Sequence, residues 1–426
     1  MILARLRVLA AAGLWLLAGS APAADVPPVE RALGFTEALT LLKARNRDLL
    51  QAQRSIEFAR ADNLQALARP NPNLSFNTAA LNPRGLGNPD STNRKFDAIV
   101  QLSQLIERGN KRELRSEATR LAVAATQGDY ADALRQLTIG LASAYYDLLL
   151  TQERVRIADA TSTLFARTVA ATQLRLKAGD IAPSDLSRIK VDQLRADNDR
   201  RQAIADRERA RLALAYLVGL DADAGALVAT DLWPVADAPE RFAIEAVVAS
   251  RPDVRAAALR VQAAEKARDL ARALRSRDVT VSAQFEHFPD QVQNNTLGFG
   301  VSVPLFLGYN FEGEIRRTEV GMQSALENLD RTRALAAVEI NRAWSDLASA
   351  RERVERYDSG LLQEAQRAAE AAEFAYRNGA LGVIDLLDAR RVFTATRNDA
   401  ATARSDLARA LVAWRAANTA YNPTSP

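Results

Sequence analysis

Hydrophobic positions recur with a helical period along two long segments of the chain, residues 113–178 and 312–378. In the first segment, Leu134, Leu137 and Leu141 follow one another at the three- and four-residue spacing of a buried helical stripe. Neither segment contains proline, and both are dense in the strong helix formers Ala, Leu, Arg, Glu and Gln. At about 1.5 Å per residue, each segment predicts a helix on the order of 100 Å long, which must pack against other helices along its length.

A second pattern, the alternation of apolar and polar residues, marks four short segments at about 73–81, 95–106, 278–288 and 296–306. A period of two places apolar side chains on one face of a strand and polar side chains on the other. Over about ten residues this is typical of the strands of an outer-membrane barrel. Turn-forming residues in 82–94 and 289–295 predict a hairpin loop between the strands of each pair. A soluble β-domain carried on a coiled coil is the alternative interpretation.

These elements occur twice and in the same order. Gly179 and Asp185 in one half correspond to Gly379 and Asp385 in the other. A repeat of about 200 residues is too long for a solenoid unit and predicts a duplicated structural half. We therefore expect two helix–strand–strand–helix repeats joined by a linker rich in Gly, Ala, Asp and Pro. The expected bounds are 24–220 for the first repeat, 221–240 for the linker and 241–426 for the second repeat.

Shorter helical segments supply partners for the two long helices. Residues 184–217 and 241–275 are each about half as long as a long helix, and we expect them to stack end to end beside one of the two. Residues 385–417 and 35–69 are expected to stack in the same way beside the other.

Four strands cannot close a membrane barrel by themselves, because the smallest such barrels have about eight. Open strand edges are excluded from lipid, where each unpaired backbone group costs several kcal/mol. If the strands cross a membrane, the chain must therefore contribute them to a barrel shared between copies. Periodicity alone does not choose between a trimer with twelve strands and a dimer with eight.

The first 23 residues read as a signal peptide. Arg5 and Arg7 precede an apolar run over 8–18, and Ala21-Pro22-Ala23 supplies a cleavage site. A retained anchor is the alternative, although the run is short for a bilayer span. Without Arg5 and Arg7, the 56 basic residues become 54 against 52 acidic ones, and no basic block stands out, so nucleic-acid binding is not indicated. The chain has no cysteine, so we expect neither disulfides nor a lipid-bearing cysteine at the mature N-terminus.

The sequence also lacks the residues of most catalytic and metal sites. Its single histidine, His287, lies near a strand end, and a transition-metal site needs several nitrogen or sulfur ligands. No phosphate-binding loop or metalloprotease motif is present. We therefore expect no enzyme activity, no cofactor and no resident metal.

The duplicated plan, with its two glycine-led turns, resembles the TolC outer-membrane efflux family over essentially the whole mature chain. Residues 103–112, Ser-Gln-Leu-Ile-Glu-Arg-Gly-Asn-Lys-Arg, resemble the strand-to-helix signature of the CzcC-like, heavy-metal branch of that family, with Asn110 in place of its usual second glycine. The resemblance implies a mainly α fold with a small β part, assembled as a homotrimer. Three copies would form a 12-stranded transmembrane β-barrel, continued by a long periplasmic α-helical barrel. The residues that carry the signature are Gln104, Glu107, Gly109, Lys111 and Arg112.

The same resemblance implies roles for the two turns, residues 179–186 and 379–386, at the periplasmic tip. These turns would dock with a periplasmic adaptor protein and close the tunnel; their docking residues would be Gly179, Pro183, Ser184, Gly379, Leu381 and Gly382. By residue match, Asp385 and Asp388 fall on acidic rings that constrict the opening, and Tyr376 matches a gate tyrosine with Asp185 as its partner. Arg188 stands where the other half has Asp388, which suggests a pair between subunits. Alternatively, Asp185 and Asp385 stabilise the first turns of their helices.

The resemblance thus implies an outer-membrane channel subunit of a tripartite, RND-type efflux system, extending into the periplasm of a Gram-negative bacterium. It would be a passive exit duct for divalent heavy-metal cations, in contact with outer-membrane lipid, an adaptor and an inner-membrane RND transporter. Multidrug efflux and type I secretion are alternatives within the class. A soluble periplasmic coiled-coil adaptor or scaffold is the alternative from another class.

Overall fold

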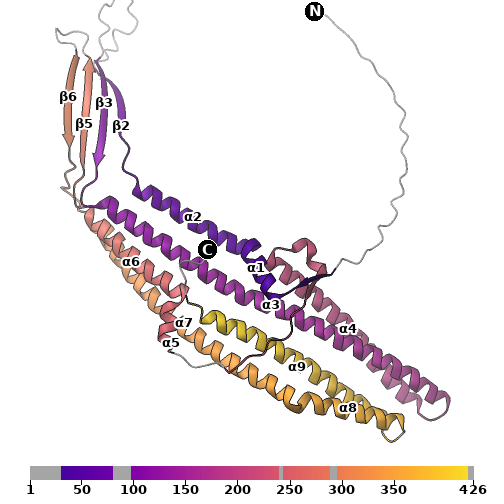
Figure 1. The fold of residues 1–426 in the computed structure, drawn as a ribbon. Coiled ribbons are helices and arrows are strands. Elements are labelled where there is room, and N and C mark those ends of the chain that lie inside the picture. Colours follow the sequence, from indigo (N-terminus) through magenta and orange to yellow (C-terminus); the bar gives the residue numbers. More distant parts are fainter. Residues whose placement is uncertain (1–29, 80–96, 239–242, 288–294, 421–426) are drawn as a thin grey trace, which may run out of the picture.

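A four-stranded sheet forms one end of an elongated molecule, and helices extend from it to the other end (Figure 1). The computed structural model describes residues 30–79, 97–238, 243–287 and 295–420. The expected signal peptide, the first expected hairpin loop and nearly all of the second lie outside the described residues. The helices are α1 (Phe35–Arg45), α2 (Arg47–Leu67), α3 (Lys111–Lys177), α4 (Pro183–Val218), α5 (Ile244–Ser250), α6 (Pro252–Ala273), α7 (Glu312–Arg356), α8 (Leu362–Arg377) and α9 (Val383–Ala417). The strands are β1 (Arg31–Leu33), β2 (Asn73–Ala79), β3 (Asp97–Ile106), β4 (Leu227–Ala229), β5 (Val279–His287) and β6 (Asn295–Ser302).

The four longer strands form one antiparallel sheet in the order β2-β3-β5-β6, in which β3 of the first half pairs with β5 of the second. The register brings alternating residues into rows across the sheet. One row joins Leu74, Leu102, Ala283 and Phe299. The adjacent row, on the opposite face, joins Ser75, Gln101, Gln284 and Gly298. The alternation in the sequence therefore becomes one apolar and one polar face.

Within the part of the chain that the structure describes, β2 and β6 pair on one side only, which leaves both edges of the sheet open. β6 ends at Ser302, four residues before the expected end of the fourth strand at 306. Pro304 lacks the N–H that would continue the ladder, which accounts for the early end.

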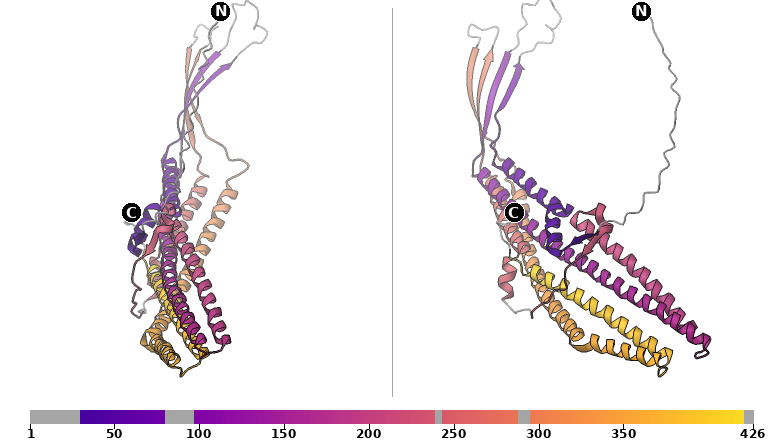
Figure 2. Two further views of the ribbon diagram at one scale, coloured as in Figure 1. Left: turned by 90° about the vertical axis from the view of Figure 1, so that its right-hand side faces the viewer. Right: turned by 45° about the vertical axis from the view of Figure 1, so that its right-hand side comes forward.

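The two long helices differ in continuity. α3 runs without a break over 67 residues. The single helix expected over 312–378 is wrong, because a π-helical turn, η3 (Tyr357–Leu361), separates α7 from α8. Gly360, with φ 162° and ψ −33°, leaves helical geometry there, and glycine is among the weakest helix formers. The chain bends where α8 leaves α7 (Figure 2).

Two of the shorter expected helices are also divided, at positions 205 residues apart. Asn46 separates α1 from α2, and Arg251 separates α5 from α6; both have extended backbone, with ψ 126° and 145°. Asn46 caps α2 by accepting a hydrogen bond from the Leu49 N–H at 3.0 Å. Arg251 precedes Pro252, which disfavours the helical conformation in the residue before it. The two halves of the repeat therefore share the position of this helix break as well as the order of their elements.

The shorter helices do not stack in the expected pairs. The Asn46 side chain donates to the Leu217 carbonyl at 3.0 Å, so that the C-terminal end of α4 meets the junction of α1 and α2. Ala417 and Trp414, at the end of α9, pack with Val248 of α5. The expected stacking of 184–217 on 241–275, and of 385–417 on 35–69, is therefore wrong. β1 pairs with β4 in parallel, which ties the entry of α1 to the chain leaving α4 through the 3-10 helix η2 (Asp221–Ala226).

A charge network around two buried arginines links the halves where α3, α6 and α7 meet. Arg251, 1% exposed, donates to Asp253 at 2.7 Å and to Glu339 at 2.8 Å. Arg135 of α3 donates to the other carboxylate oxygen of Glu339 at 2.5 Å. Burial alone would raise the pKa of Glu339, but the hydrogen bond from Arg251 and the charge of Arg135 outweigh it and hold that pKa below its ordinary value. Among the described residues, no helix combines the length and apolar character needed to cross a bilayer.

Candidate functional site

The end of the molecule farthest from the sheet consists of two helical hairpins, α3–α4 and α8–α9 (Figure 1). Gly179 and Gly379 follow the C-terminal ends of α3 and α8 and have left-handed φ angles of 84° and 73°. Each turn is closed by a hydrogen bond, from Asp180 N–H to the Arg175 carbonyl at 3.0 Å and from Ala380 N–H to the Ala375 carbonyl at 2.9 Å. A side chain would meet no other atom at either glycine, so the backbone angle alone favours glycine there.

An apolar cluster packs the two hairpins against each other. Leu381, one of the expected docking residues, is partly buried against it, whereas Ser184 is exposed on the first turn of α4. Pro183 is the first residue of α4 and Gly382 is the N-cap of α9, so both fix helix starts. The buried members of the cluster are Phe165, Val169, Ile189, Ala196, Tyr376, Val383, Leu386 and Leu387.

The expected gate tyrosine, Tyr376, is buried and joins α8 to α3. Its hydroxyl lies 3.3 Å from Oγ1 of Thr172. Arg175 donates to the Tyr376 carbonyl at 3.3 Å, and its guanidinium lies 5.2 Å from the centroid of the ring. Asp185, the expected partner, forms no hydrogen bond with Tyr376 among the described residues; it lies half-buried in the first turn of α4. The hydroxyl of Tyr376 therefore bonds to a neighbour that the sequence did not indicate.

Two arginines of α9 add links that the sequence analysis missed. Arg390, 6% exposed, donates to Oγ1 of Thr168 at 2.7 Å and pairs with Glu373 at 3.3 Å. Burial lowers the pKa of Arg390. Arg391 reaches both carboxylate oxygens of Asp192 on α4 at 2.8 Å. In the sequence, the sign of these links was that Arg390 stands among apolar positions of the predicted helix 385–417.

The expected ring residues Asp385 and Asp388 are both exposed at the start of α9. Within the described chain, neither they nor Arg188 forms an ion pair. The first-turn position of Asp385 is one where a negative charge is favourable in any case. The acidic rings and the pair between Arg188 and Asp388 would both require further copies of the chain, so they stay predictions.

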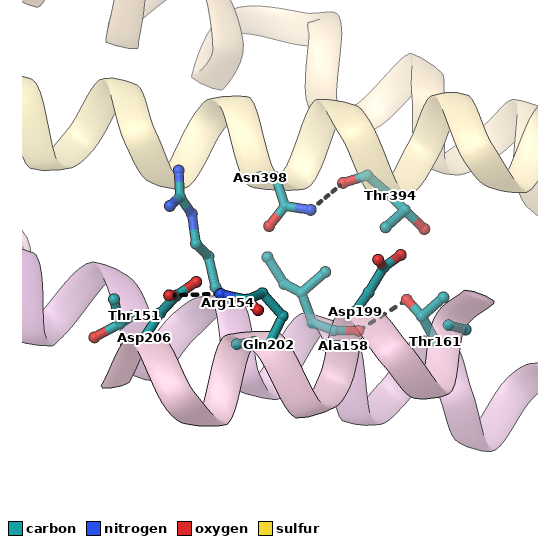
Figure 3. A pocket seen from close by; sticks show the side chains of 12 residues that line it. Thr151, Arg154, Ala158, Thr161, Asp199, Gln202, Asp206, Thr394 and Asn398 are labelled. Atoms are coloured by element: carbon teal, nitrogen blue, oxygen red, sulfur yellow. Dashed lines mark hydrogen bonds between the residues drawn. The ribbon is translucent and has the colours of Figure 1, made fainter. Parts of the chain in front are cut away.

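Farther from the tip, α3, α4 and α9 line a recess of about 310 Å³ (Figure 3). Two of its polar side chains make local bonds, from Gln202 to Asp206 at 3.0 Å and from Asn398 to the Thr394 carbonyl at 3.2 Å, whereas Arg154 of α3 donates across to Oγ1 of Thr402 on α9 at 3.1 Å. The described residues contain no group of three or more histidine, cysteine, aspartate or glutamate side chains placed to hold a metal ion. The recess is thus a groove between the two hairpins, without a set of metal ligands.

The second candidate region is the strand-to-helix signature, which lies where β3 passes into α3. Gly109 and Asn110 both take left-handed φ angles, of 76° and 57°. They turn Lys111 inward, where its ammonium donates to the Ser276 carbonyl at 2.8 Å and to both oxygens of Asp278 at 2.9 Å. The backbone N–H of Arg108 also donates to Asp278, at 2.9 Å. The signature therefore ties the first half to the segment between α6 and β5.

The other signature residues hold the same junction. The Gln104 side chain donates to the Pro70 carbonyl at 2.8 Å, which fixes the approach to β2. Glu107 pairs with Arg115 at 2.8 Å, and Arg112 pairs with Glu113 at 2.8 Å. All five expected residues thus meet at one place, and their contacts are structural. Asp278 accepts hydrogen bonds from both Lys111 and the Arg108 N–H. The sequence could have drawn attention to it, because the repeat aligns it with another polar residue, Asn73.

This chain belongs to the outer membrane efflux protein family, which its sequence matches over residues 38–220 and 243–418. It is 25% identical over 372 residues to the cobalt-zinc-cadmium resistance protein CzcC of Cupriavidus metallidurans, covering 86% of this chain and 85% of that protein. It is 24% identical over 388 residues to the probable outer membrane lipoprotein SilC of Salmonella typhimurium, covering 87% and 81%. A solved membrane protein from Pseudomonas aeruginosa shares the fold, with a TM-score of 0.79 at 18% identity over 92% of this chain and 91% of that one.

These similarities confirm the predicted family and the predicted fold class, a mainly helical chain with few strands and duplicated halves. The family places the chain among outer-membrane efflux channels.

Proposed function

We propose that three copies of this chain form the outer-membrane exit duct of a tripartite efflux system that expels divalent heavy-metal cations. A periplasmic adaptor would bind the tip, and an inner-membrane RND transporter would supply the driving force. The metal assignment is supported by the similarity to CzcC, whose name states resistance to cobalt, zinc and cadmium.

The observation that carries the proposal is the four-stranded sheet with one apolar face and two open edges. Its apolar side chains stand well exposed on the isolated chain; Phe299 is 86% and Leu297 is 74% exposed. Lipid would cover this face, and strands of neighbouring copies would satisfy the edges. Exposed apolar residues on α7 and α2, such as Val338 and Phe58, supply helical faces for the same neighbours.

The assembly is tested first. The chain, extracted in detergent from outer membranes, should have three times the mass of one chain by light scattering corrected for bound detergent, and it should form ion channels in planar bilayers. A soluble monomer would contradict the proposal, and a stable dimer would replace the barrel of twelve strands by one of eight.

The tip is tested by conductance and ion selectivity. If Asp385 and Asp388 surround a narrow opening, replacing both with asparagine should lower the preference for cations over anions. Reversing both charges in Arg188→Asp with Asp388→Arg should preserve a pair between subunits, whereas either change alone should disrupt it. Identical conductance in the single and double variants would argue against that pair.

The closed state is tested at Tyr376. Replacing it with phenylalanine removes the bond to Thr172 and should raise the fraction of time that the channel is open. Tyr216→Phe, at a half-exposed tyrosine of α4 near its other end, is the matched control. Equal opening in both variants would show that the Thr172 bond does not hold the tip.

The substrate is tested in cells. A strain that lacks this chain but retains its adaptor and pump should lose tolerance to zinc, cobalt or cadmium and regain it on complementation. Unchanged tolerance to all three, together with increased sensitivity to drugs, would favour the multidrug alternative.

A further inference from the structure

The end of the sheet that meets the helices has a surface of exposed apolar residues and clustered aromatic rings. Beyond the last residue of β6, Leu305 and Leu307 remain 66% and 89% exposed. Between and after them lie three aromatic residues: the rings of Phe306 and Phe311 meet edge to face at 5.0 Å, and Tyr309 lies 6.1 Å from Phe311. Clustered aromatic rings beside exposed apolar residues are typical of the level at which a membrane gives way to water.

Six arginines lie at this end of the sheet. In the sequence, each stands a few residues from the end of a strand or from the start of α7. All six are exposed, and within the described residues none forms an ion pair. Arg277 lies with its guanidinium 5.8 Å from the Phe306 ring, and Arg275 donates to the Asn310 carbonyl at 3.2 Å. We call this set the arginine collar: Arg69, Arg108, Arg275, Arg277, Arg316 and Arg317.

Three carboxylates of the same region are already paired with cations outside the collar. Glu107 is paired with Arg115, Glu113 with Arg112, and Asp278 with Lys111. Glu314 accepts a hydrogen bond from the Tyr309 hydroxyl at 2.6 Å, and Glu312 accepts one from the Asn310 N–H at 3.0 Å; neither is paired with a cation among the described residues. The six collar arginines therefore outnumber the two carboxylates near them that lack a cation, and the collar carries an excess of positive charge, although the chain as a whole has nearly equal numbers of basic and acidic residues, 56 and 52.

A recess lies within the collar, between the segment that leads into β2 and the end of β3. Its volume is about 720 Å³; Arg69 lines it without an ion pair among the described residues, whereas Arg112, which also lines it, is the partner of Glu113. Its two carboxylates, Glu107 and Glu113, are the paired ones described above. Arginine suits an anion with several oxygens, because its planar fork donates two parallel hydrogen bonds.

We propose that the arginine collar binds the phosphate headgroups of phospholipids in the membrane leaflet nearest the helices, with the recess beside Arg69 seating one headgroup. The proposal rests on the membrane role proposed above. The occupant follows from the position of the collar, because the surface directly continues the exposed apolar face of the sheet. A lipid that covers that face brings its phosphate to the level of the arginines.

The test compares two triple variants of the full-length protein in detergent, Arg69→Gln/Arg108→Gln/Arg277→Gln and the control Arg54→Gln/Arg167→Gln/Arg201→Gln. The control removes the same charge from exposed arginines that lie away from the collar and, among the described residues, form no ion pairs. Mixed micelles containing phosphatidylglycerol or phosphate-free diacylglycerol supply the probe, and native mass spectrometry measures the retained lipid.

The collar variant should lose about fivefold in affinity for phosphatidylglycerol for each arginine removed, and high salt should reduce the difference. The control variant and the diacylglycerol arm should show no such loss. Equal losses in both variants, or none in either, would overturn the proposal. Displacement of bound phosphatidylglycerol by an equal concentration of glycerol phosphate would also overturn it, since the site would then bind free phosphate.

Bilayer conductance of the wild-type protein separates this result from the fate of the channel proposal. Conducting channels with unchanged lipid binding in the collar variant would refute the collar alone. A wild-type protein that neither inserts nor conducts would refute the channel.

Discussion

The ion pair between Lys111 and Asp278 allows a quantitative test of why the strand-to-helix signature has its sequence. Lys111 is 6% exposed, and its ammonium makes three hydrogen bonds, all to the segment that connects α6 with β5. Replacing Lys111 with methionine keeps most of the volume but leaves Asp278 without its cation. Breaking a buried ion pair from one side costs about 3–5 kcal/mol. Because the Asp278 side chain retains 23% exposure and the N–H of Arg108, we expect about 2–3 kcal/mol here.

The neighbouring pair of the same signature provides the control. Arg112 and Glu113 are 33% and 59% exposed, so Arg112→Gln should cost less than about 1 kcal/mol. The free energy of unfolding is measured by guanidinium titration in detergent, followed by far-ultraviolet circular dichroism at one protein concentration for all variants.

A double-mutant cycle completes the test. Lys111→Met with Asp278→Leu should be less destabilised than the two single changes added together, by about 2 kcal/mol, because the double variant leaves no unpaired charge. If Lys111→Met costs no more than Arg112→Gln, or if the two changes are additive, the structural explanation of the signature is wrong. Lys111 would then require another role, such as contact with a transported ion.

Two further changes test other parts of the fold. Gly109→Ala should destabilise by about 1–2 kcal/mol because the residue has a left-handed φ and its new Cβ would lie 2.6 Å from the Oγ of Ser276, whereas Gly140→Ala inside α3 meets no atom and should be neutral or stabilising in the same denaturation assay. Glu339→Gln should cost about 1 kcal/mol at neutral pH, since its 39% exposed carboxylate loses charge-assisted bonds. The lowered pKa of Glu339 makes that contribution complete above the ordinary value of 4.5 and lost as pH falls through the folded-state pKa, so the wild type should lose more stability on acidification than the variant. A constant difference across the acid range would contradict this assignment.

Local patterns predicted the elements that are fixed by local physics. The alternation at Val281, Ala283 and Phe285 set the apolar face of β5, because side-chain direction in a strand depends only on residue parity. Gly179 and Gly379 indicated the hairpin turns because few other residues tolerate the left-handed backbone that ends a helix there.

The features that the sequence did not predict depend on contacts between distant segments. The half-length helices have similar lengths, so length could not choose their partners; the bond from Asn46 to Leu217 and the pairing of β1 with β4 make that choice. The π-helical turn at Gly360 also escaped prediction, because an isolated glycine is tolerated inside many helices. At the tip, Thr172 lies 204 residues from Tyr376, beyond the reach of any motif.

The pairing of β3 with β5 has a consequence for how copies of the chain would assemble. It sets a first-half strand beside a second-half strand, and the open edges, β2 and β6, also belong to the first and the second half. In the proposed ring, β6 of one copy would meet β2 of the next, which again joins a second half to a first. Every strand pairing between two halves in a three-copy ring would then be of one kind. Half of these pairings would form within a chain as it folds, and the other half between chains. Duplication would therefore reduce the number of molecules that must meet in the membrane from six half-sized units to three chains.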